Sequence, residues 1–482
     1  MKSVFLAYIL LQLVSGVSHA TESRSRPNVI VIFIDDEGYG DVGCFGATGF
    51  ETPHIDQLAS EGMRFTHFYA AQAVCSASRA GLMTGAYPNR VGITGALFPY
   101  DQVGLNDAEY TMAEMFQDQG YATACIGKWH LGWQKEFLPL QHGFDEFFGL
   151  PYSNDMWPHD DLTGEKVPEG HKRAQYPELP LIEGNEPIGY ISSLQDQDQL
   201  TRRYTAKAVD FIDRQAEEPF FLYLAHSMAH IPLGVSEHFR GKSELGLYGD
   251  VMMEVDWSVG EIVRALEANE LTDNTLIVFT TDNGPWTWFG NHGGSAGGLR
   301  EGKLTSWEGG QRVPFVLKWP GQVPQGSVCN QLACAVDLLP TFAAIADGEL
   351  SDNKIDGLDI GGLFVDPQSK SPRETILYYG GKNHLNAVRM GSWKLVLPHS
   401  YPALVSPGKD GAKGKIQKAV INEPELYNLA SDPGENYNLI GSYPEKAAQI
   451  MTVVEQARSE LGDLNVGLEK GSENRTIGKL KE

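Results

Sequence analysis

The chain has 482 residues, of which 42% are hydrophobic, and it carries a formal net charge of −24 at pH 7. Its length predicts two domains, because one hydrophobic core rarely extends beyond about 250–300 residues. The acidic composition argues against a nucleic-acid partner, which would select a basic surface. It does not exclude a small anionic substrate, because the charge inside a cleft can oppose the net charge.

The N-terminus predicts a secretory signal peptide over residues 1–20. Lys2 provides the positive charge, residues 4–14 form the apolar segment, and Ala20 ends a sequence that suits cleavage. An apolar stretch of about eleven residues is too short to cross a lipid bilayer. We therefore expect no membrane span and a secreted, periplasmic or lysosomal location.

Continuous apolar runs predict buried strands further along the chain. They cover residues 29–34, 121–126, 220–225, 276–281 and 313–318. Runs of this kind are typical of parallel strands that are buried on both faces. The first four runs lead directly into Asp, Lys, His or Asn residues. Ligands bind beyond the carboxyl ends of the strands in such sheets, so these polar residues are candidates for a site.

Amphipathic stretches between the strands predict helices over residues 52–62, 108–119 and 252–269. Alternating strands and helices indicate an α/β fold with right-handed crossovers. We expect a large, doubly wound, mostly parallel sheet flanked by helices over residues 27–368.

The composition changes after this region, where residues 366–372 have the character of a linker. Two short strands and a terminal helix are predicted beyond it, over residues 387–390, 393–397 and 451–461. They indicate a small antiparallel sheet with one helix in a C-terminal subdomain, residues 369–482. The Gly- and Lys-rich stretch 409–418 predicts a solvated turn.

Oxygen-bearing side chains follow two of the predicted strands. Asp35 and Asp36 follow the first, and Asp282 and Asn283 follow the fourth. Either pair alone could cap a helix or start a turn. Two pairs that each close a buried strand favour a metal site, and hard oxygen ligands select Ca²⁺ or Mg²⁺ rather than Zn²⁺.

A second motif runs from Cys75 to Gly85, with the sequence CSASRAGLMTG. A lone cysteine is most often a buried structural thiol. This motif, however, resembles the type I, formylglycine-dependent sulfatases, and specifically their arylsulfatase A-like members in the alkaline phosphatase superfamily. Further matches are the segments GKWHLG at 127–132 and GKLTSWEGG at 302–310. Ala77 stands where proline is usual, and the core pattern Cys-x-Pro/Ala-x-Arg is kept.

The resemblance implies a reaction and a modification. A maturation enzyme would oxidise Cys75 to Cα-formylglycine, whose hydrated aldehyde attacks sulfur. A sulfate monoester, aryl or carbohydrate, would then be hydrolysed by S–O cleavage through a covalent sulfoenzyme. The partners implied are this maturation enzyme and a sulfated small molecule or glycan.

The resemblance also implies the roles of individual residues. Arg79 would steady the metal-bound diol, Lys128 would bind a sulfate oxygen, and His130 would act as the base. His230 and Lys303 would lie at the leaving group and bind sulfate.

Ser153 would be a further sulfate contact. The metal, usually Ca²⁺, would be held by Asp35, Asp36, Asp282 and Asn283, and an oxygen of the residue formed from Cys75 would complete its coordination.

Two other functions stay open at this point. A phosphatase or phosphonate monoester hydrolase of the same superfamily mostly carries Ser or Thr as nucleophile, or binds two metals through additional His ligands. A non-catalytic protein that binds sulfated glycans would leave Cys75 unconverted. The sequence does not identify the substrate, and Trp157, Trp286 and Trp288 could stack on a sugar or pack locally.

The remaining cysteines are Cys44, Cys125, Cys329 and Cys334. Four cysteines permit three disulfide pairings, which the sequence does not rank. Cys44 and Cys125 could equally be buried free thiols.

Overall fold

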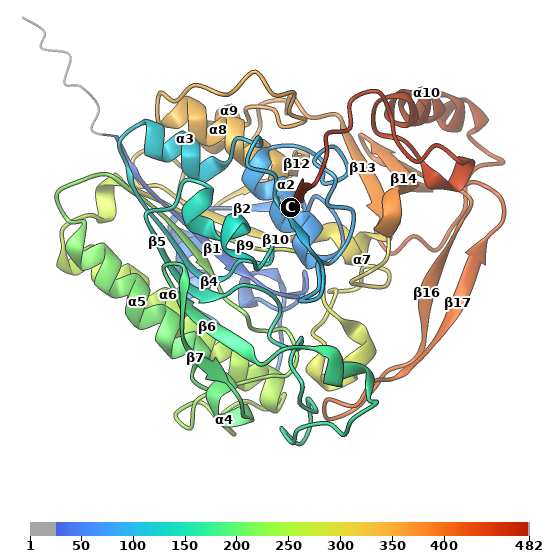
Figure 1. The fold of residues 1–482 in the computed structure, drawn as a ribbon. Coiled ribbons are helices and arrows are strands. Elements are labelled where there is room, and N and C mark those ends of the chain that lie inside the picture. Colours follow the sequence, from blue (N-terminus) through green and yellow to red (C-terminus); the bar gives the residue numbers. More distant parts are fainter. Residues whose placement is uncertain (1–25, 481–482) are drawn as a thin grey trace, which may run out of the picture.

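The structure is a computed structural model that describes residues 26–480. The predicted signal peptide lies outside the described residues. One eleven-stranded sheet with helices on both faces forms most of the molecule, and smaller antiparallel sheets follow toward the C-terminus (Figure 1). The predicted α/β architecture is therefore confirmed.

Five parallel strands form the middle of the large sheet. In spatial order they are β9 (Thr275–Thr281), β1 (Asn28–Ile34), β8 (Phe220–Ala225), β4 (Ala122–Lys128) and β5 (Glu146–Leu150). All seven residues of β1 are buried. The apolar runs in the sequence arise from this burial on both faces.

Further strands extend the sheet at both edges. Beyond β9 lie β10 (Arg312–Lys318) and β2 (Met63–Tyr69), each antiparallel to its neighbour, and then β11 (Ser327–Cys329) and β12 (Ala333–Cys334), which pair parallel to β2. Beyond β5 lie the antiparallel strands β6 (Leu179–Glu183) and β7 (Glu186–Ile191). The sheet is thus parallel in its middle and mixed at its edges.

Two hydrophobic cores lie on opposite faces of the sheet. Ile30, Ile32 and Ile34 of β1 contribute to one core, whereas Val29 and Phe33 contribute to the other, as the two-residue period of a strand requires. Helices α1 (Pro53–Glu61), α5 (Leu200–Arg214) and α6 (Leu247–Ala268) cover the first face. Helices α2 (Cys75–Thr84), α3 (Met112–Asp118) and α8 (Leu338–Ile345) cover the second.

The C-terminal region contains a four-stranded antiparallel sheet and a long hairpin. The sheet is formed by β13 (Thr375–Gly380), β14 (His384–Met390), β15 (Trp393–Val396) and β18 (Glu425–Asn428), with α10 (Pro444–Leu461) packed on it. The hairpin is formed by β16 (His399–Ser406) and β17 (Lys415–Ile421). The remaining short elements are β3 (Val103–Gly104), β19 (Gly478–Lys479), α4 (Leu194–Gln197), α7 (Glu308–Gln311) and α9 (Gly361–Val365).

Several predicted boundaries differ from those observed. The helix predicted over 108–119 begins only at Met112, because Thr111 and Glu114 form a capping box: the Thr111 hydroxyl accepts the Glu114 N–H at 3.1 Å, and the Glu114 carboxylate accepts the Thr111 N–H at 2.6 Å. The helices predicted over 252–269 and 451–461 begin earlier, at Leu247 and Pro444.

The solvated turn predicted over residues 409–418 was wrong in part. Residues 415–418 belong to β17, and only the residues between β16 and β17 form a turn. The hairpin is largely exposed, so its strands lack the apolar pattern that marks a buried strand.

Every cysteine is a free thiol in the structure, and no disulfide forms among residues 26–480. Cys125, Cys329 and Cys334 are buried. Of the alternatives left open by the sequence, the structure therefore supports free thiols, which are buried at Cys125 and only partly buried at Cys44.

A buried charge cluster joins the C-terminal sheet to the large sheet. Glu308, at the start of α7, accepts the hydroxyls of Tyr69 in β2 and Tyr378 in β13, both at 2.6 Å. The ammonium of Lys394 in β15 lies 3.2 Å from Glu308 and 2.8 Å from Glu435. Burial alone would raise the pKa of Glu308, but the neighbouring cations, Lys394 first, lower it to about 2.

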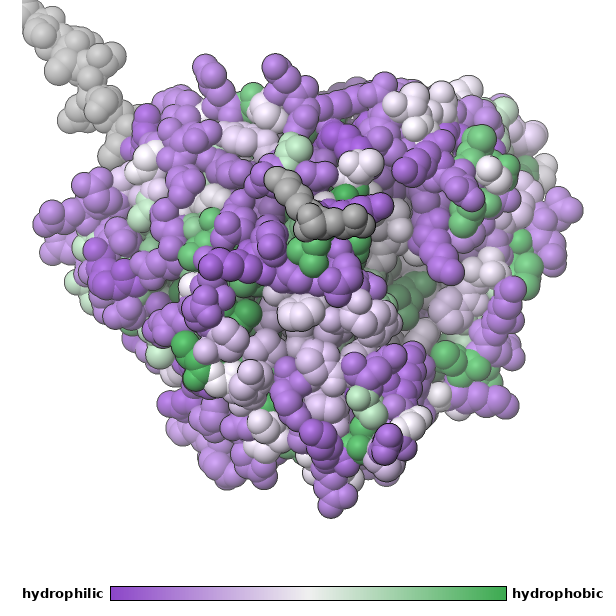
Figure 2. All heavy atoms as spheres, in the orientation of Figure 1, coloured by the Kyte–Doolittle hydropathy of each residue, from purple (hydrophilic) through white to green (hydrophobic). Residues whose placement is uncertain are grey.

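Hydrophilic side chains cover most of the face shown in Figure 2, and the exposed apolar residues form only small groups there. Within residues 26–480, no helix combines the length and the apolar character needed to cross a lipid bilayer.

The Glu308 cluster predicts a large stability effect at Lys394. Lys394→Met would leave two buried carboxylates without their shared cation, which should lower the free energy of unfolding by about 3–5 kcal/mol. Chemical unfolding of the purified protein measures this loss. The control is Lys370→Met, which removes an exposed lysine paired with Glu374 and should leave the unfolding midpoint unchanged. Equal midpoints for the two variants would contradict a structural role for the cluster.

Candidate active site

Two adjacent strands bring the oxygen-bearing side chains together. β1 and β9 pair in parallel with Ile34 opposite Thr281, so the residues that follow them meet at the same edge of the sheet. The Asp36 N–H donates to Asp282 Oδ1 at 3.2 Å, and the Asn283 amide donates to Asp36 Oδ1 at 2.7 Å. The Asn283 amide oxygen is buried and has no hydrogen-bond partner.

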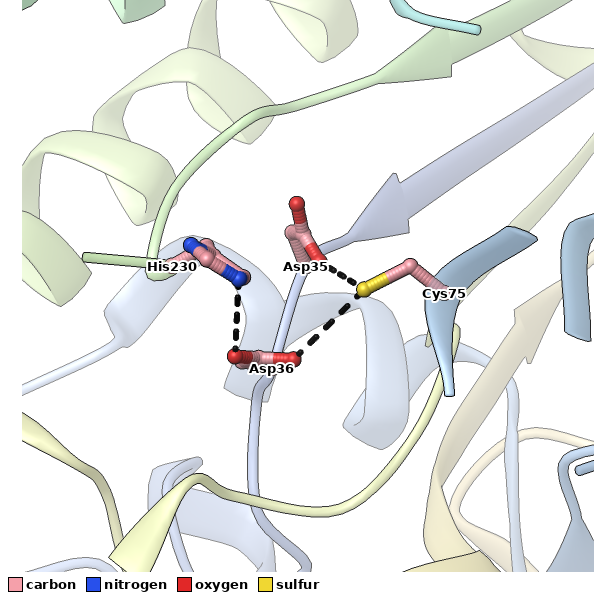
Figure 3. A group of neighbouring side chains, drawn as sticks. All are labelled: Asp35, Asp36, Cys75 and His230. Atoms are coloured by element: carbon pink, nitrogen blue, oxygen red, sulfur yellow. Dashed lines mark hydrogen bonds and ion pairs between the residues drawn. The ribbon is translucent and has the colours of Figure 1, made fainter. Parts of the chain in front are cut away.

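Cys75 lies above these carboxylates as the first residue of α2. Its thiol donates to Asp35 Oδ1 at 3.3 Å, and Sγ lies 4.0 Å from Asp36 Oδ1 (Figure 3). Potential ligand atoms of Asp35, Asp36, Cys75 and His230 all lie within 4.8 Å of one another, so this group could hold a metal ion. The unpartnered oxygen of Asn283 and the hard carboxylate oxygens fit Ca²⁺ or Mg²⁺.

Arg79 connects the edge that carries the carboxylates to strand β4. It follows Cys75 by one helical turn, so both side chains lie on one face of α2, as the sequence predicts. Its Nε and Nη2 donate to Asp282 Oδ2 at 3.0 and 2.8 Å, and Nη1 donates to the Lys128 carbonyl at 2.7 Å. The guanidinium is fully buried and fully paired.

Two buried lysines contact the carboxylates. Lys128 forms an ion pair with Asp35 and donates to the Ser153 hydroxyl at 3.0 Å. Lys303 donates to both oxygens of Asp36, at 2.6 and 2.8 Å, and lies 3.2 Å from Cys75 Sγ. Each lysine thus neutralises one aspartate.

Gly127 fixes the position of Lys128 at the end of β4. Its φ is +114°, and a Cβ atom at this position would lie 1.8 Å from the Ala225 carbonyl oxygen of β8. Only glycine combines this backbone conformation with this close approach.

His130 has the geometry of an unprotonated base. Its Nε2 lies 2.9 Å from the Leu97 carbonyl oxygen, which can only accept, so Nε2 carries the proton and Nδ1 keeps its lone pair. The Nδ1 atom is buried without a partner. Burial, and then the charge of Lys128, hold the pKa of His130 well below its usual value, so the ring is neutral at pH 7.

His230 faces Asp36 from the segment that follows β8. Its Nδ1 donates to the Ile231 carbonyl at 2.6 Å, and its Nε2 lies 3.5 Å from Asp36 Oδ2. Burial and the charge of Lys303 lower its pKa. His226 is instead buried against α6, with Nε2 at 3.1 Å from the Ser258 hydroxyl, and it has no contact with the site.

The electrostatics of the site disfavour a thiolate at Cys75. Burial and the negative charges of Asp282 and Asp35 raise the pKa of the thiol. Burial and the charge of Asp35 likewise raise the pKa of Asp282 to about 7, although Arg79 opposes them. An unmodified Cys75 would therefore be a weak nucleophile here.

The site opens into a pocket of about 560 Å³. Of the candidate residues, Cys75, His130, Ser153, His230 and Lys303 line it. The structure thus brings together every site residue that the sequence singles out, some at the pocket wall and the others behind it. The segments containing them are far apart in the sequence and meet only in the fold.

Sequence reasoning did not assign Asp155 to the site, and it left open whether Trp286 stacks on a sugar or packs locally. Asp155 lines the pocket, and one of its carboxylate oxygens is buried without a partner. The Lys303 ammonium lies 4.5 Å from the centre of the Trp286 ring, a cation–π contact. Trp157, by contrast, is fully buried and donates to Asp161 at 3.0 Å, so it packs locally. The only signal in the sequence was position, because Asp155 lies two residues after Ser153 and Trp286 lies three residues after Asn283.

Comparisons with known proteins agree with this geometry. The sulfatase family profile matches residues 27–348, and the profile of the C-terminal region of aryl-sulfatase matches residues 371–477. The chain is 39% identical to arylsulfatase A of Bos taurus over 464 residues, covering 93% of this chain and 89% of that protein. It is 36% identical to N-acetylgalactosamine-6-sulfatase of Sus scrofa over 485 residues, covering 94% and 90%.

A solved structure shows the same fold. The PsFucS1 sulfatase from Pseudoalteromonas sp. superposes with a TM-score of 0.81 at 29% sequence identity, covering 94% of this chain and 92% of that one. The chain therefore belongs to the sulfatase family and is a sulfuric ester hydrolase.

Proposed function

We propose that the enzyme hydrolyses a carbohydrate or aryl sulfate monoester by S–O cleavage, with Cys75 converted to formylglycine as the nucleophile. The observation that carries this proposal is the position of Cys75. Its Sγ lies 3.3 Å from Asp35 and 3.2 Å from the Lys303 ammonium, at a pocket wall, in a setting that disfavours a thiolate. The hydroxyl of a hydrated aldehyde attacks as an oxygen nucleophile, so it does not require the Cys75 thiol to ionise.

We further propose Ca²⁺ as the metal, with Mg²⁺ as the alternative, held by Asp35, Asp36, Asp282, Asn283 and the oxygen of residue 75. When bound, the cation would polarise the hydrated aldehyde and offset the buried carboxylates. Residue 75 in its hydrated form would supply one hydroxyl for attack and a second for release of sulfate.

The chain's own side chains then have distinct tasks. His130 Nδ1, which has a free lone pair, would accept the proton of the second hydroxyl. Arg79 donates to Asp282 and would hold the hydrated side chain of residue 75 in position. Lys128 and Ser153 would bind sulfate oxygens side by side, because the Lys128 ammonium donates to the Ser153 hydroxyl at 3.0 Å.

His230 and Lys303 would bind the sulfate group on the side of the leaving oxygen. Lys303, as an ammonium group, can donate the proton that the departing alcohol requires. Cationic groups around the sulfuryl oxygens stabilise the charge that develops in transfer, as they do in phosphoryl transfer.

The likeness to two relatives guides the substrate class. Arylsulfatase A and N-acetylgalactosamine-6-sulfatase both align with more than nine-tenths of the chain, which supports an aryl or a carbohydrate sulfate. We also propose a catalytic domain over 27–368 and a C-terminal subdomain over 369–482. Export through the predicted signal peptide and conversion by a formylglycine-generating enzyme complete the proposal.

The reaction class is tested by comparing 4-nitrophenyl sulfate with 4-nitrophenyl phosphate. We expect a higher kcat/KM for the sulfate, and Cys75→Ser should lower this value on the order of 10³-fold or more, the scale of losing a nucleophile. Cys125→Ser, which alters a buried cysteine of β4 that does not line the pocket, is the matched control. Faster phosphate turnover would favour the phosphatase alternative.

Metal dependence has a readout apart from activity. After chelation, Ca²⁺ at a hundredfold excess over its Kd should raise the free energy of unfolding by about 3 kcal/mol, because only the folded state holds the site. Asp36→Asn should abolish this stabilisation, whereas the exposed Asp213→Asn should keep it. A calcium-independent unfolding midpoint in the unaltered protein would overturn the proposed site.

A further inference from the structure

We propose that Lys172 and Lys413 form a second anion-binding subsite in the pocket that contains Cys75, and that it takes a carboxylate or a further sulfate of a polyanionic substrate. The inference rests on the proposed function and deepens it, because it concerns which sulfate esters this site accepts.

The two lysines come from different parts of the chain. Lys172 begins the short 3-10 helix Lys172–Gln175 in the segment that follows β5, and Lys413 lies in the turn of the β16–β17 hairpin. Both line the same pocket as Cys75, His230 and Lys303. Figure 1 shows the orange hairpin extending from the C-terminal sheet toward the segments that follow β5 and β9. The C-terminal region thus contributes a cation to the pocket.

The fold holds the hairpin turn in place. The N–H groups of Gly408 and Gly414 both donate to the Trp288 carbonyl, at 3.0 and 2.8 Å. Asn291 and Asp410 exchange two further hydrogen bonds, at 2.8 and 3.0 Å. The Lys413 ammonium lies 4.5 Å from the centre of the Trp288 ring. Lys413 is therefore positioned by backbone contacts rather than by a flexible loop.

Neither lysine has a carboxylate partner among residues 26–480. The nearby Arg173 differs, because it pairs with Asp161 and donates to the Asp155 carbonyl. Burial and then the charge of Lys172 lower the pKa of Lys413, which agrees with the place of both lysines in the wall of one pocket. Both ammonium groups are therefore available to an anion bound in this pocket, which would neutralise them.

The chemical class of the ligand follows from the shared pocket. A sulfate ester at Cys75 satisfies Lys128 and Lys303, so the two outer lysines remain for another anionic group of the same molecule. A simple aryl sulfate has no such group. Glycans with a second sulfate or a uronate do, and the subsite would select them.

The test uses inhibition, so it does not depend on which ester is cleaved. A disulfated disaccharide and its monosulfated counterpart would compete with 4-nitrophenyl sulfate. In Lys172→Met/Lys413→Met, the inhibition constant of the disulfated probe should rise about tenfold, the effect of losing two partly exposed ion pairs. The constant of the monosulfated probe, and the kcat and KM for 4-nitrophenyl sulfate, should stay unchanged. Lys409→Met is the matched control, because this exposed hairpin lysine pairs with Asp410 and does not line the pocket.

An unchanged constant for the disulfated probe would overturn the subsite, as would equal weakening of both probes, which indicates a general disturbance of the pocket. If the unaltered enzyme cleaves neither the aryl sulfate nor the sulfated disaccharides, the proposed function fails independently of the subsite. Calorimetric titration of the same two probes into the unaltered and double-variant proteins then decides the subsite alone.

Discussion

The whole site depends on pairing three buried carboxylates with three buried cations at the carboxyl edge of one sheet. Asp35, Asp36 and Asp282 are fully or almost fully desolvated, and each contacts a cation that is also buried. Isolated buried charges would cost several kcal/mol each, so the cluster exists only if every member stays in place. This requirement explains why strand ends, helix α2 and the loop with Lys303 are held by direct contacts. The three negative and three positive charges cancel, so the cluster is formally neutral on an acidic protein.

The C-terminal region stabilises this arrangement from a distance. The loop that carries Lys303 leads directly into α7, where Glu308 binds Tyr378 and Lys394 of the C-terminal sheet. The β16–β17 hairpin reaches the pocket from the same region and is tied to Trp288 beside it. The C-terminal region therefore supports the loop that carries Lys303 and supplies part of the pocket wall. We infer that recognition of the substrate depends on both parts of the chain.

The central sheet and the site edge could be predicted because burial leaves a strong pattern. Strands such as β1 are apolar at every position after the first, Asn28, and the polar residues that follow each strand mark the carboxyl edge. The hairpin could not be predicted this way, because exposed strands pair through their backbones and place few demands on side chains. Lys413 was missed for a related reason: it reaches the pocket only through tertiary packing of the hairpin. The start of α3 was misjudged because Thr111 caps it within an apparently continuous helical pattern.

The central claim is that Cys75 acts after conversion to formylglycine. Cys75 lies beside the carboxylates proposed to hold the metal, where burial and negative charge disfavour a thiolate. Its motif has Ala77 where proline is usual, so conversion is the step to verify. Mass spectrometry of the peptide that contains residue 75, from active protein produced with its maturation enzyme, tests this most directly. The account predicts the mass of formylglycine at this position, in proportion to the turnover of an aryl sulfate. An intact cysteine in a fully active preparation would contradict it.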